Sequence, residues 1–241
     1  MHFGAECVIL LYMIDYLIEI VAGAIAAIVV LTFHEFSHAF VAYKCGDPTA
    51  KFYGRMTLNP FKHFDPLGLI MFATVGFGWA KPVPINPNNF RNYRAGSFWT
   101  SAAGVITNYI MAFVFYPLLL VMLTYVCPLI KWPYLAGFIE SIFYFLFAYS
   151  LNFCVFNLLP FYPLDGFRII DALTTNRGKF YWFLRKYGYY IFLGLMAINI
   201  LARWIPILNY VNVYGYVMQF AVQIFGKPIT LFWNHIFGLF I

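Results

Sequence analysis

Long apolar stretches separated by polar connections dominate the chain and predict membrane-spanning helices. The apolar stretches cover residues 8–43, 97–127, 134–158, 184–204 and 208–225. A bilayer core about 30 Å thick needs roughly 20 helical residues to cross it, and the first three stretches supply more than that. The last stretch is broken at Gly226-Lys227-Pro228. The pattern predicts an all-α polytopic membrane protein with a core of three helices and about two further C-terminal helices.

The connection between the first two long stretches, residues 44–94, is the most polar part of the chain. Its residues 69–77 are apolar but too few to span, so they suit a strand or a re-entrant segment better. Residues 78–87 contain three prolines, which exclude helix and favour extended backbone. We therefore expect a short extended or re-entrant segment near residues 66–90.

The distribution of basic residues predicts how the chain is oriented in the membrane. Only 10% of the residues are charged and 63% are hydrophobic, and the formal net charge is +6. Two connections, residues 44–94 and 166–186, hold 12 of the 15 Lys and Arg residues. The positive-inside rule places both connections in the cytoplasm and the N-terminus outside. The basic charge is thus a topology signal, and we expect no nucleic-acid partner.

Composition predicts one membrane-embedded domain over residues 1–241, with a core at about 8–175 and accessory C-terminal helices at about 180–241. No soluble module of independent size interrupts it. The four cysteines form no CxxC pair, and we expect buried or idle thiols at all four positions. They are Cys7, Cys45, Cys127 and Cys154.

The strongest chemical signal is an HExxH sequence, residues 34–38, inside the first apolar stretch. In a helix His34 and His38 share one face, and Glu35 flanks that face. Two imidazoles at this spacing can hold one zinc ion, with the glutamate placed to take a proton from a bound water. Three ionisable groups so close together in hydrocarbon cost several kcal/mol. The motif therefore indicates metal chemistry inside a membrane.

A zinc site of this kind needs a third protein ligand, and Asp165 is the best candidate. It follows a helix that Pro160 and Pro163 end, and it lies in an apolar segment. Irregular backbone at membrane depth is tolerated only when it is buried in protein or lines a cavity. Local sequence leaves two interpretations open for Asp165, a metal ligand or a turn aspartate before Gly166.

Other acidic residues fit a metal site less well. Glu140 lies at the wrong end of its helix, and Asp47 and Asp65 are expected in solvated turns. Asp171 is expected to pair with Arg168 or Lys179.

Five motifs occur together in one order. They are HEFSH (34–38), GDPTA (46–50), LNPFKHFDPLG (58–68), GWAKPVPINP (78–87) and NLLPFYPLDG (157–166). In these motifs and their order, roughly residues 25–175 of the chain resemble the site-2 protease family of intramembrane metalloproteases. The resemblance implies one Zn²⁺ held by His34, His38 and Asp165, with Glu35 as the catalytic residue. It also implies a three-helix catalytic core, here in a minimal peptidase domain without PDZ or CBS modules.

The function that the resemblance implies is hydrolysis of peptide bonds within transmembrane segments of membrane-tethered substrates, known as regulated intramembrane proteolysis. The partners are then a transmembrane protein substrate and the lipid bilayer, with the active site opening towards the cytoplasm. The alternative is a non-proteolytic membrane protein that binds or transports a metal, because intramembrane His, Glu and Asp also mark ion paths. Glu35 favours the protease, since a simple binding site does not need it.

Four further residues are candidates for substrate binding. Trp79, Pro82 and Val83 belong to the extended segment, which we expect to pair with an unwound substrate as an added strand. Asn157 lies near the broken end of its helix, where it could bond the unwound backbone or a substrate carbonyl; a structural role is equally open. His63, like His2 and His235, is expected at the surface or the membrane interface.

One departure from the family pattern concerns the second long helix. The family has a proline after Ala-Gly, whereas this chain reads Ala103-Gly104-Val105. We therefore do not expect a helix kink of the kind that this proline would give. Gly104 and Asn108 still fit close helix packing and an interhelical hydrogen bond.

Overall fold

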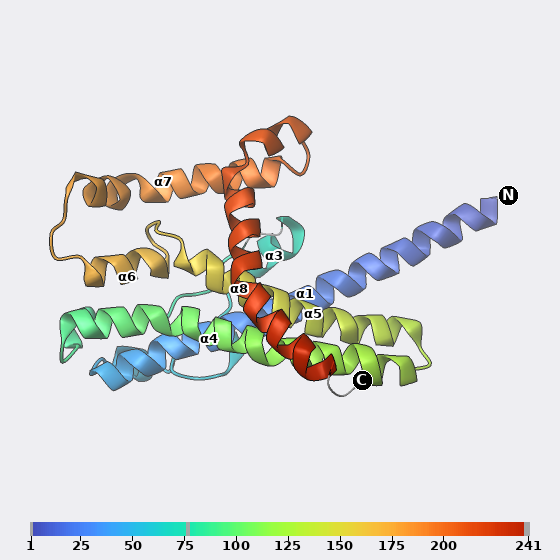
Figure 1. Cartoon of the computed structure of the whole chain (residues 1–241), viewed down its shortest axis with the longest axis horizontal. Coiled ribbons are helices and arrows are strands. Elements are labelled where there is room, and N and C mark those ends of the chain that lie inside the picture. The colour runs from blue at the N-terminus through green and yellow to red at the C-terminus, as the bar shows by residue number, and fades with distance from the viewer. Residues whose placement is uncertain (1, 76–77, 239–241) are drawn as a thin grey trace.

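The computed structural model describes residues 2–75 and 78–238, and helices account for most of this part of the chain (Figure 1). The α-helices are α1 (His2–Cys45), α2 (Thr49–Phe52), α3 (Pro66–Val75), α4 (Tyr93–Val121), α5 (Pro133–Leu158), α6 (Asp165–Leu173), α7 (Lys179–Leu201) and α8 (Val213–Gly238). Within the described ranges extended backbone pairs only at a single bridge, between Phe64 and Ala80. The predicted all-α fold is confirmed. Residues 76–77 of the predicted short segment, residues 239–241 and the side chain of Cys7 lie outside the described part.

Three segments are long and apolar enough to cross a membrane, as the sequence predicts. They are Leu10–Cys45, Tyr93–Leu129 and Pro133–Leu158. α1 has 44 residues, which corresponds to about 66 Å, roughly twice the thickness of the hydrocarbon core. Its first part accordingly projects beyond the other helices (Figure 1), and Tyr12 and Tyr16 are exposed there.

α1, α4 and α5 form the central bundle, because α1 presents small residues to its neighbours. Ala26 and Val30 are completely buried and pack with Met111 of α4 and Leu146 of α5. Lipid tails are as apolar as these side chains, so membrane helices associate mainly through close packing, which small residues allow. The bundle is the scaffold on which the histidines of α1 are held.

The short apolar segment after Asp65 forms helix α3, so of the two interpretations of residues 69–77 the strand is wrong for residues 69–75, and the re-entrant segment stays a prediction. Asp65 Oδ1 accepts hydrogen bonds from the backbone N–H groups of Leu67 at 2.9 Å and Gly68 at 3.1 Å. With Pro66 at the first helical position, Asp65 is a helix N-cap, which corrects its prediction as a solvated turn residue. Added side-chain atoms at Gly68 would overlap the carbonyl of Trp79, so α3 lies against the extended segment.

Residues 78–86 are extended, as predicted, and the polar connection holds them at several points. The Lys81 N–H donates to the His63 carbonyl at 2.8 Å. Arg55 Nη2 donates to the Lys81 carbonyl at 2.6 Å. His63 is 1% exposed, and its Nε2 lies 2.7 Å from the Thr57 carbonyl. The prediction of a surface position for His63 is therefore wrong, because the histidine closes the loop that supports the extended segment.

Asp47 is also buried, which contradicts its prediction as a solvated turn residue. Its carboxylate accepts from the Asn86 N–H at 2.7 Å, the Asn89 amide at 2.8 Å and both the N–H and hydroxyl of Thr49. Burial raises the pKa of Asp47, but these hydrogen bonds outweigh it and leave the pKa below its ordinary value. The ionised carboxylate thus ties the end of α1 to the end of the extended segment.

The C-terminal part differs from its prediction in two helices. α6 was not predicted as a separate helix, and α8 runs without a break through Gly226-Lys227-Pro228. Gly226 is buried against Leu151 of α5, so the contact holds this part of the helix despite the proline. α8 crosses the bundle steeply and changes direction about halfway along its length (Figure 1).

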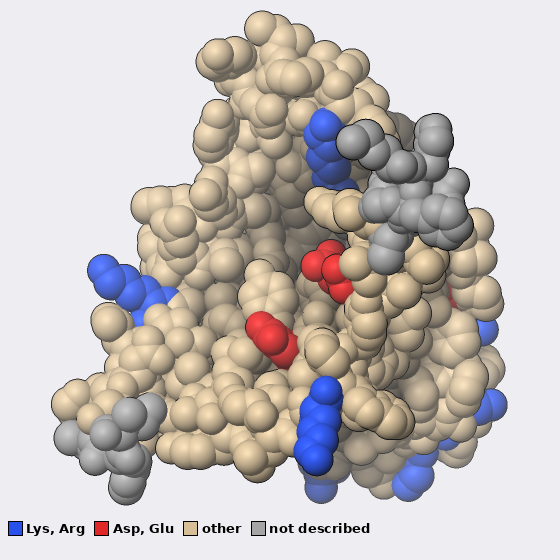
Figure 2. Space-filling model, turned by 90° about the vertical axis from the view of Figure 1, so that its right-hand side faces the viewer, with Lys and Arg blue, Asp and Glu red and all other residues tan. Residues whose placement is uncertain are grey.

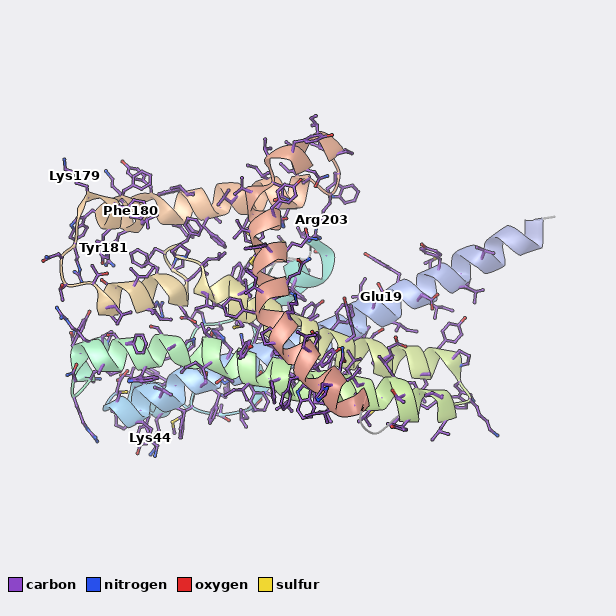
Figure 3. All side chains as sticks on the ribbon, viewed as in Figure 1. Glu19, Lys44, Lys179, Phe180, Tyr181 and Arg203 are labelled. Carbon is purple, nitrogen blue, oxygen red and sulfur yellow. The ribbon has the colours of Figure 1, made fainter. Side chains whose placement is uncertain are left out.

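Each of the two basic connections has a lysine at the same end of the molecule. Lys44 and Lys179 occupy that end, whereas Glu19 and Arg203 lie towards the other (Figure 3). Arg203 Nη1 donates to the Val75 carbonyl at 2.9 Å and so links the end of α7 to the end of α3.

Candidate metal centre

Three buried side chains from two helices converge on one point inside the bundle. His34 and His38 lie one turn apart on α1, and Asp165 is the first residue of α6. Their ligand atoms are 3.0 Å (Nε2 to Nε2), 3.1 Å (His38 Nε2 to Asp165 Oδ2) and 3.3 Å (His34 Nε2 to Asp165 Oδ2) apart. Exposed fractions are 5%, 6% and 6% in chain order. The structure thus brings together the residues that the sequence proposes as ligands.

Asp165 reaches this point because the chain turns tightly after α5. Pro160 and Pro163 cannot continue that helix, and α6 starts afresh at Asp165. A side chain at Gly166 would overlap the carbonyl of Leu158, so only glycine allows this approach. Asp171, one of the competing acids, instead pairs with Arg177 at 2.8 Å, which corrects the predicted partners Arg168 and Lys179.

The cluster has the chemistry of a cation site. Asp165 Oδ2 is buried without a hydrogen-bond donor. The neutral imidazole nitrogens that face it are acceptors as well when Nδ1 carries the proton. Three acceptors 3.0–3.3 Å apart match the roughly 3.4 Å between ligands of a tetrahedral ion with bonds near 2.1 Å. The residues present therefore fit a metal ion with one position left open.

One face of α4 holds both histidines in place through positions 100, 104 and 108, each one helical turn apart. His38 Nδ1 lies 2.6 Å from the Thr100 carbonyl. His34 Nδ1 lies 3.0 Å from the amide nitrogen of Asn108. A Cβ on Gly104 would come within 2.5 Å of His34 Cε1 and His38 Nε2. The missing side chain at Gly104 is what lets α4 approach the cluster.

Asn108 was predicted only as an interhelical hydrogen-bonding residue, and the structure gives it a more specific place. Its Oδ1 is buried without a partner. A half turn of the amide exchanges the two atoms, so that Oδ1 accepts from Nδ1–H of His34 and Nε2 is left free as a ligand. Outer partners of this kind fix the tautomer of a metal-binding histidine.

We expect Asn108→Leu to weaken Zn²⁺ binding by about 10- to 100-fold, because leucine fills the space but accepts no hydrogen bond. Asn108→Asp keeps an acceptor and should retain most of the affinity. Competition with a chelator on the purified protein in detergent measures both. Ser150→Ala is a matched control, since its buried hydroxyl bonds only Leu146 of its own helix. Unchanged affinity in Asn108→Leu would show that Asn108 does not orient His34.

Glu35 is 9% exposed and is held from the opposite side by the extended segment. Its Oε2 accepts a hydrogen bond of 2.8 Å from the backbone N–H of Val83, 48 residues along the chain. Sequence reasoning placed Val83 near a substrate but missed this contact with Glu35. No local signal could have revealed it, because it depends on how the connection folds back onto α1.

The remaining candidates have no hydrogen bond to the cluster or to Glu35 in the described part of the chain. Trp79 and Pro82 are exposed along the extended segment, and the Pro82 carbonyl accepts from Arg55 at 3.2 Å. Asn157 is half-buried and donates to the Phe153 carbonyl of its own helix at 3.0 Å. The structure therefore joins Val83 to the site and gives Asn157 a bond within α5. Cys45, Cys127 and Cys154 are free thiols.

Comparison with known proteins identifies the family of this chain. Residues 22–199 match the family model described as "Peptidase family M50". Two relatives carry the name "Putative zinc metalloprotease": YwhC of Bacillus subtilis (strain 168) and Rip2 of Mycolicibacterium smegmatis (strain ATCC 700084 / mc(2)155). YwhC is 42% identical over 175 residues, 72% of this chain and 78% of the relative. Rip2 is 28% identical over 211 residues, 85% of this chain and 77% of the relative.

No solved structure matches the chain significantly. The family model covers α1 from residue 22 onward, all of α4 and α5, both histidines and Asp165. The chain belongs to peptidase family M50, the site-2 protease family.

Proposed function

We propose that this protein is an intramembrane zinc metalloprotease that cuts peptide bonds within the transmembrane segments of membrane-tethered substrates. The observation that carries the proposal is the buried His34, His38 and Asp165 cluster beside Glu35, inside a bundle of helices able to span a membrane. The names of both relatives support the metal and the protease activity. Membrane burial of the cluster supports a substrate that is itself in the membrane.

Each residue has a role that its position supports. His34, His38 and Asp165 would hold the zinc ion. Zinc bound there supplies a Lewis acid that polarises a carbonyl and makes a bound water more acidic. Glu35 takes the proton of the attacking water and passes it to the leaving amine. The Val83 N–H fixes one carboxylate oxygen of Glu35 and so keeps the base beside the cluster.

The extended segment that contains Trp79, Pro82 and Val83 is proposed to bind an unwound substrate as an added strand. The hydrogen bond from the Val83 N–H to Glu35 supports this role, because it holds the extended segment directly beside the proposed catalytic residue. Val83→Pro would remove the N–H that holds Glu35, and it would also disturb the backbone that is proposed to pair with the substrate. A loss of cleavage in that variant therefore has two causes. Asn157 is proposed as a further substrate contact, because its bond to the Phe153 carbonyl uses one N–H and leaves the amide oxygen able to accept.

The charge distribution supports an orientation with the α1–α4 and α5–α7 connections in the cytoplasm and the N-terminus outside. The site then opens towards the cytoplasm. Cysteines introduced in a cysteine-free variant at Asn88 and Asn176, both exposed in those connections, should react with an impermeant maleimide only after the cells are opened. Lys131→Cys, in the opposite turn, should react in intact cells. The reverse pattern would invert the topology.

A metal transporter is the alternative from another class, and one experiment separates the two. The purified protein is incubated in detergent with a single-span peptide, and vesicles that contain the protein are tested for zinc uptake. The proposal predicts fragments of the peptide and no uptake above that of empty vesicles. Uptake without fragments would favour the transporter.

A further inference from the structure

A large cavity lies between α5 and the two C-terminal helices, apart from the metal cluster. It has a volume of about 740 Å³, in the range of ligand-binding pockets. The end of the molecule where α7 turns into α8 is hollowed between that turn and the bundle (Figure 2). Tyr149, Asn152, Phe153 and Phe156 of the α5 span form one wall, which places the cavity at membrane depth.

Amide side chains from all three helices face this cavity. α8 contributes Gln219 and Gln223, one helical turn apart, α7 contributes Asn199, and α5 contributes Asn152. The amides of Gln219 and Gln223 form no hydrogen bond with any other residue in the described part of the chain. An amide left unpaired in hydrocarbon costs several kcal/mol. Polar side chains at this depth indicate a ligand path.

The cavity adjoins a second pocket beside the extended segment. Phe72, Gly78 and Phe153 line the cavity and also line this narrower pocket of about 20 Å³. That pocket reaches Trp79 and Leu31. Leu31 lies one turn before Glu35 on α1. The cavity therefore lies on the side of the extended segment where Trp79 and Gly78 are, within reach of a chain bound along that segment.

The amides identify the chemistry of the occupant. Asn199 already accepts from Asn212 and Asn152 already donates to the Ala148 carbonyl, so Gln219 and Gln223 carry the argument. A lipid acyl chain offers no hydrogen-bond partner and would leave the two glutamine amides unpaired. A peptide backbone offers one donor and one acceptor per residue, and each Gln or Asn amide both donates and accepts. A substrate helix must give up its internal hydrogen bonds near the scissile peptide. The cavity amides can replace those bonds where water cannot.

We propose that this cavity receives the unwound stretch of the substrate's transmembrane segment next to the scissile bond, and that Gln219, Gln223 and Asn199 bind its backbone. The inference rests on the proposed protease function and adds a second binding region to it. Gln219 and Gln223 stabilise the opened helix, so they determine which membrane segments can be cut. A segment that unwinds easily depends on them less than a regular helix does.

Disulfide crosslinking tests the placement without relying on cleavage. In a cysteine-free Glu35→Gln variant, Gln219→Cys and Gln223→Cys are each paired with a single-span probe peptide. The probe has an apolar segment of about 20 residues, Gly-Pro at its centre, and one cysteine moved along it. Both variants should crosslink to positions near the Gly-Pro. Phe220→Cys, exposed on the same helix but outside the cavity lining, should not.

Cleavage provides the second test. Gln219→Leu combined with Gln223→Leu should slow cutting of the same probe by about tenfold, as expected for two lost amide hydrogen bonds. A short soluble peptide with the same scissile sequence should be cut at the unchanged rate, and zinc content should stay at the wild-type level. The matched control is Tyr216→Leu with Phe220→Leu, an exposed pair at the same spacing that does not line the cavity.

The outcomes distinguish a failure of this inference from a failure of the proposed protease function. If the wild-type protein cuts neither peptide, the proposed function fails. If it cuts both and the glutamine variant does so equally well, the function stands and the cavity has no part in substrate binding. Equal crosslinking from Gln219→Cys and Phe220→Cys, or none from the two glutamine positions, would also overturn the inference.

Discussion

Glu35→Gln is expected to abolish proteolysis and leave the zinc content unchanged. Glutamine has nearly the same shape, and its side-chain oxygen can still accept the Val83 N–H, so the extended segment keeps its place. It cannot take up the proton of the attacking water, and loss of a general base slows such reactions by about 10²- to 10⁴-fold. His34→Ala, His38→Ala and Asp165→Ala should instead lose zinc, since each removes one of three ligands.

Metal analysis and a cleavage assay on the same preparations distinguish the two kinds of variant. Glu19→Gln is the matched control, because Glu19 is exposed on the same helix and precedes His34 by 15 residues, which is about 22 Å along the helix. It should behave as the wild type in both assays. Normal cleavage by Glu35→Gln would exclude Glu35 as the base, and a full equivalent of zinc in Asp165→Ala would exclude Asp165 as a ligand.

Gly104→Ala should damage the metal site although it adds a single methyl group. The new Cβ would lie 2.5 Å from His34 Cε1 and from His38 Nε2. Those rings cannot simply turn away, because their Nδ1 atoms are bonded to Asn108 and to the Thr100 carbonyl. Either the rings leave their ligand positions or α4 moves away from α1, and overpacking of this kind costs about 1–3 kcal/mol.

We therefore expect at least about a tenfold loss of zinc affinity, together with a lower melting temperature in detergent; tenfold corresponds to 1.4 kcal/mol, within the overpacking range. Chelator competition and a thermal unfolding assay measure the two effects. Gly137→Ala on α5 is the control, because its added Cβ would meet no atom within 4 Å. Alanine favours helix over glycine, so this control should be neutral or slightly stabilising. Wild-type zinc affinity in Gly104→Ala would mean that α4 does not set the geometry of the site.

The local sequence pattern was sufficient to predict those features that depend only on residues close together in the chain. The third span, predicted at 134–158, begins at Pro133 and ends at Leu158. His34 and His38 share a face because their spacing equals one helical turn, so the sequence alone could pair them. Asp65 followed by Pro66 also carried a local signal, a helix N-cap, but had been interpreted as a turn. That error explains why a strand was one of the two interpretations of residues 69–77.

Contacts between distant segments could not be predicted in the same way. The Val83 N–H meets Glu35 only because Asp47, Arg55 and His63 hold the polar connection against α1. Nothing near Asp47 or His63 in the sequence distinguishes a buried support from an exposed loop residue. The unbroken course of α8 likewise depends on the contact of Gly226 with Leu151 of another helix. Proline in isolation favours a break.

The most direct test of intramembrane proteolysis is to locate the cut. The wild-type protein and Glu35→Gln are reconstituted in lipid vesicles with a single-span peptide that has Gly-Pro at the centre of its apolar segment, and the fragment masses are measured. We predict new termini inside the apolar segment with the wild type and none with Glu35→Gln. Cuts confined to the water-exposed flanks, or equal cutting by both proteins, would contradict a Glu35-dependent protease that works within the membrane.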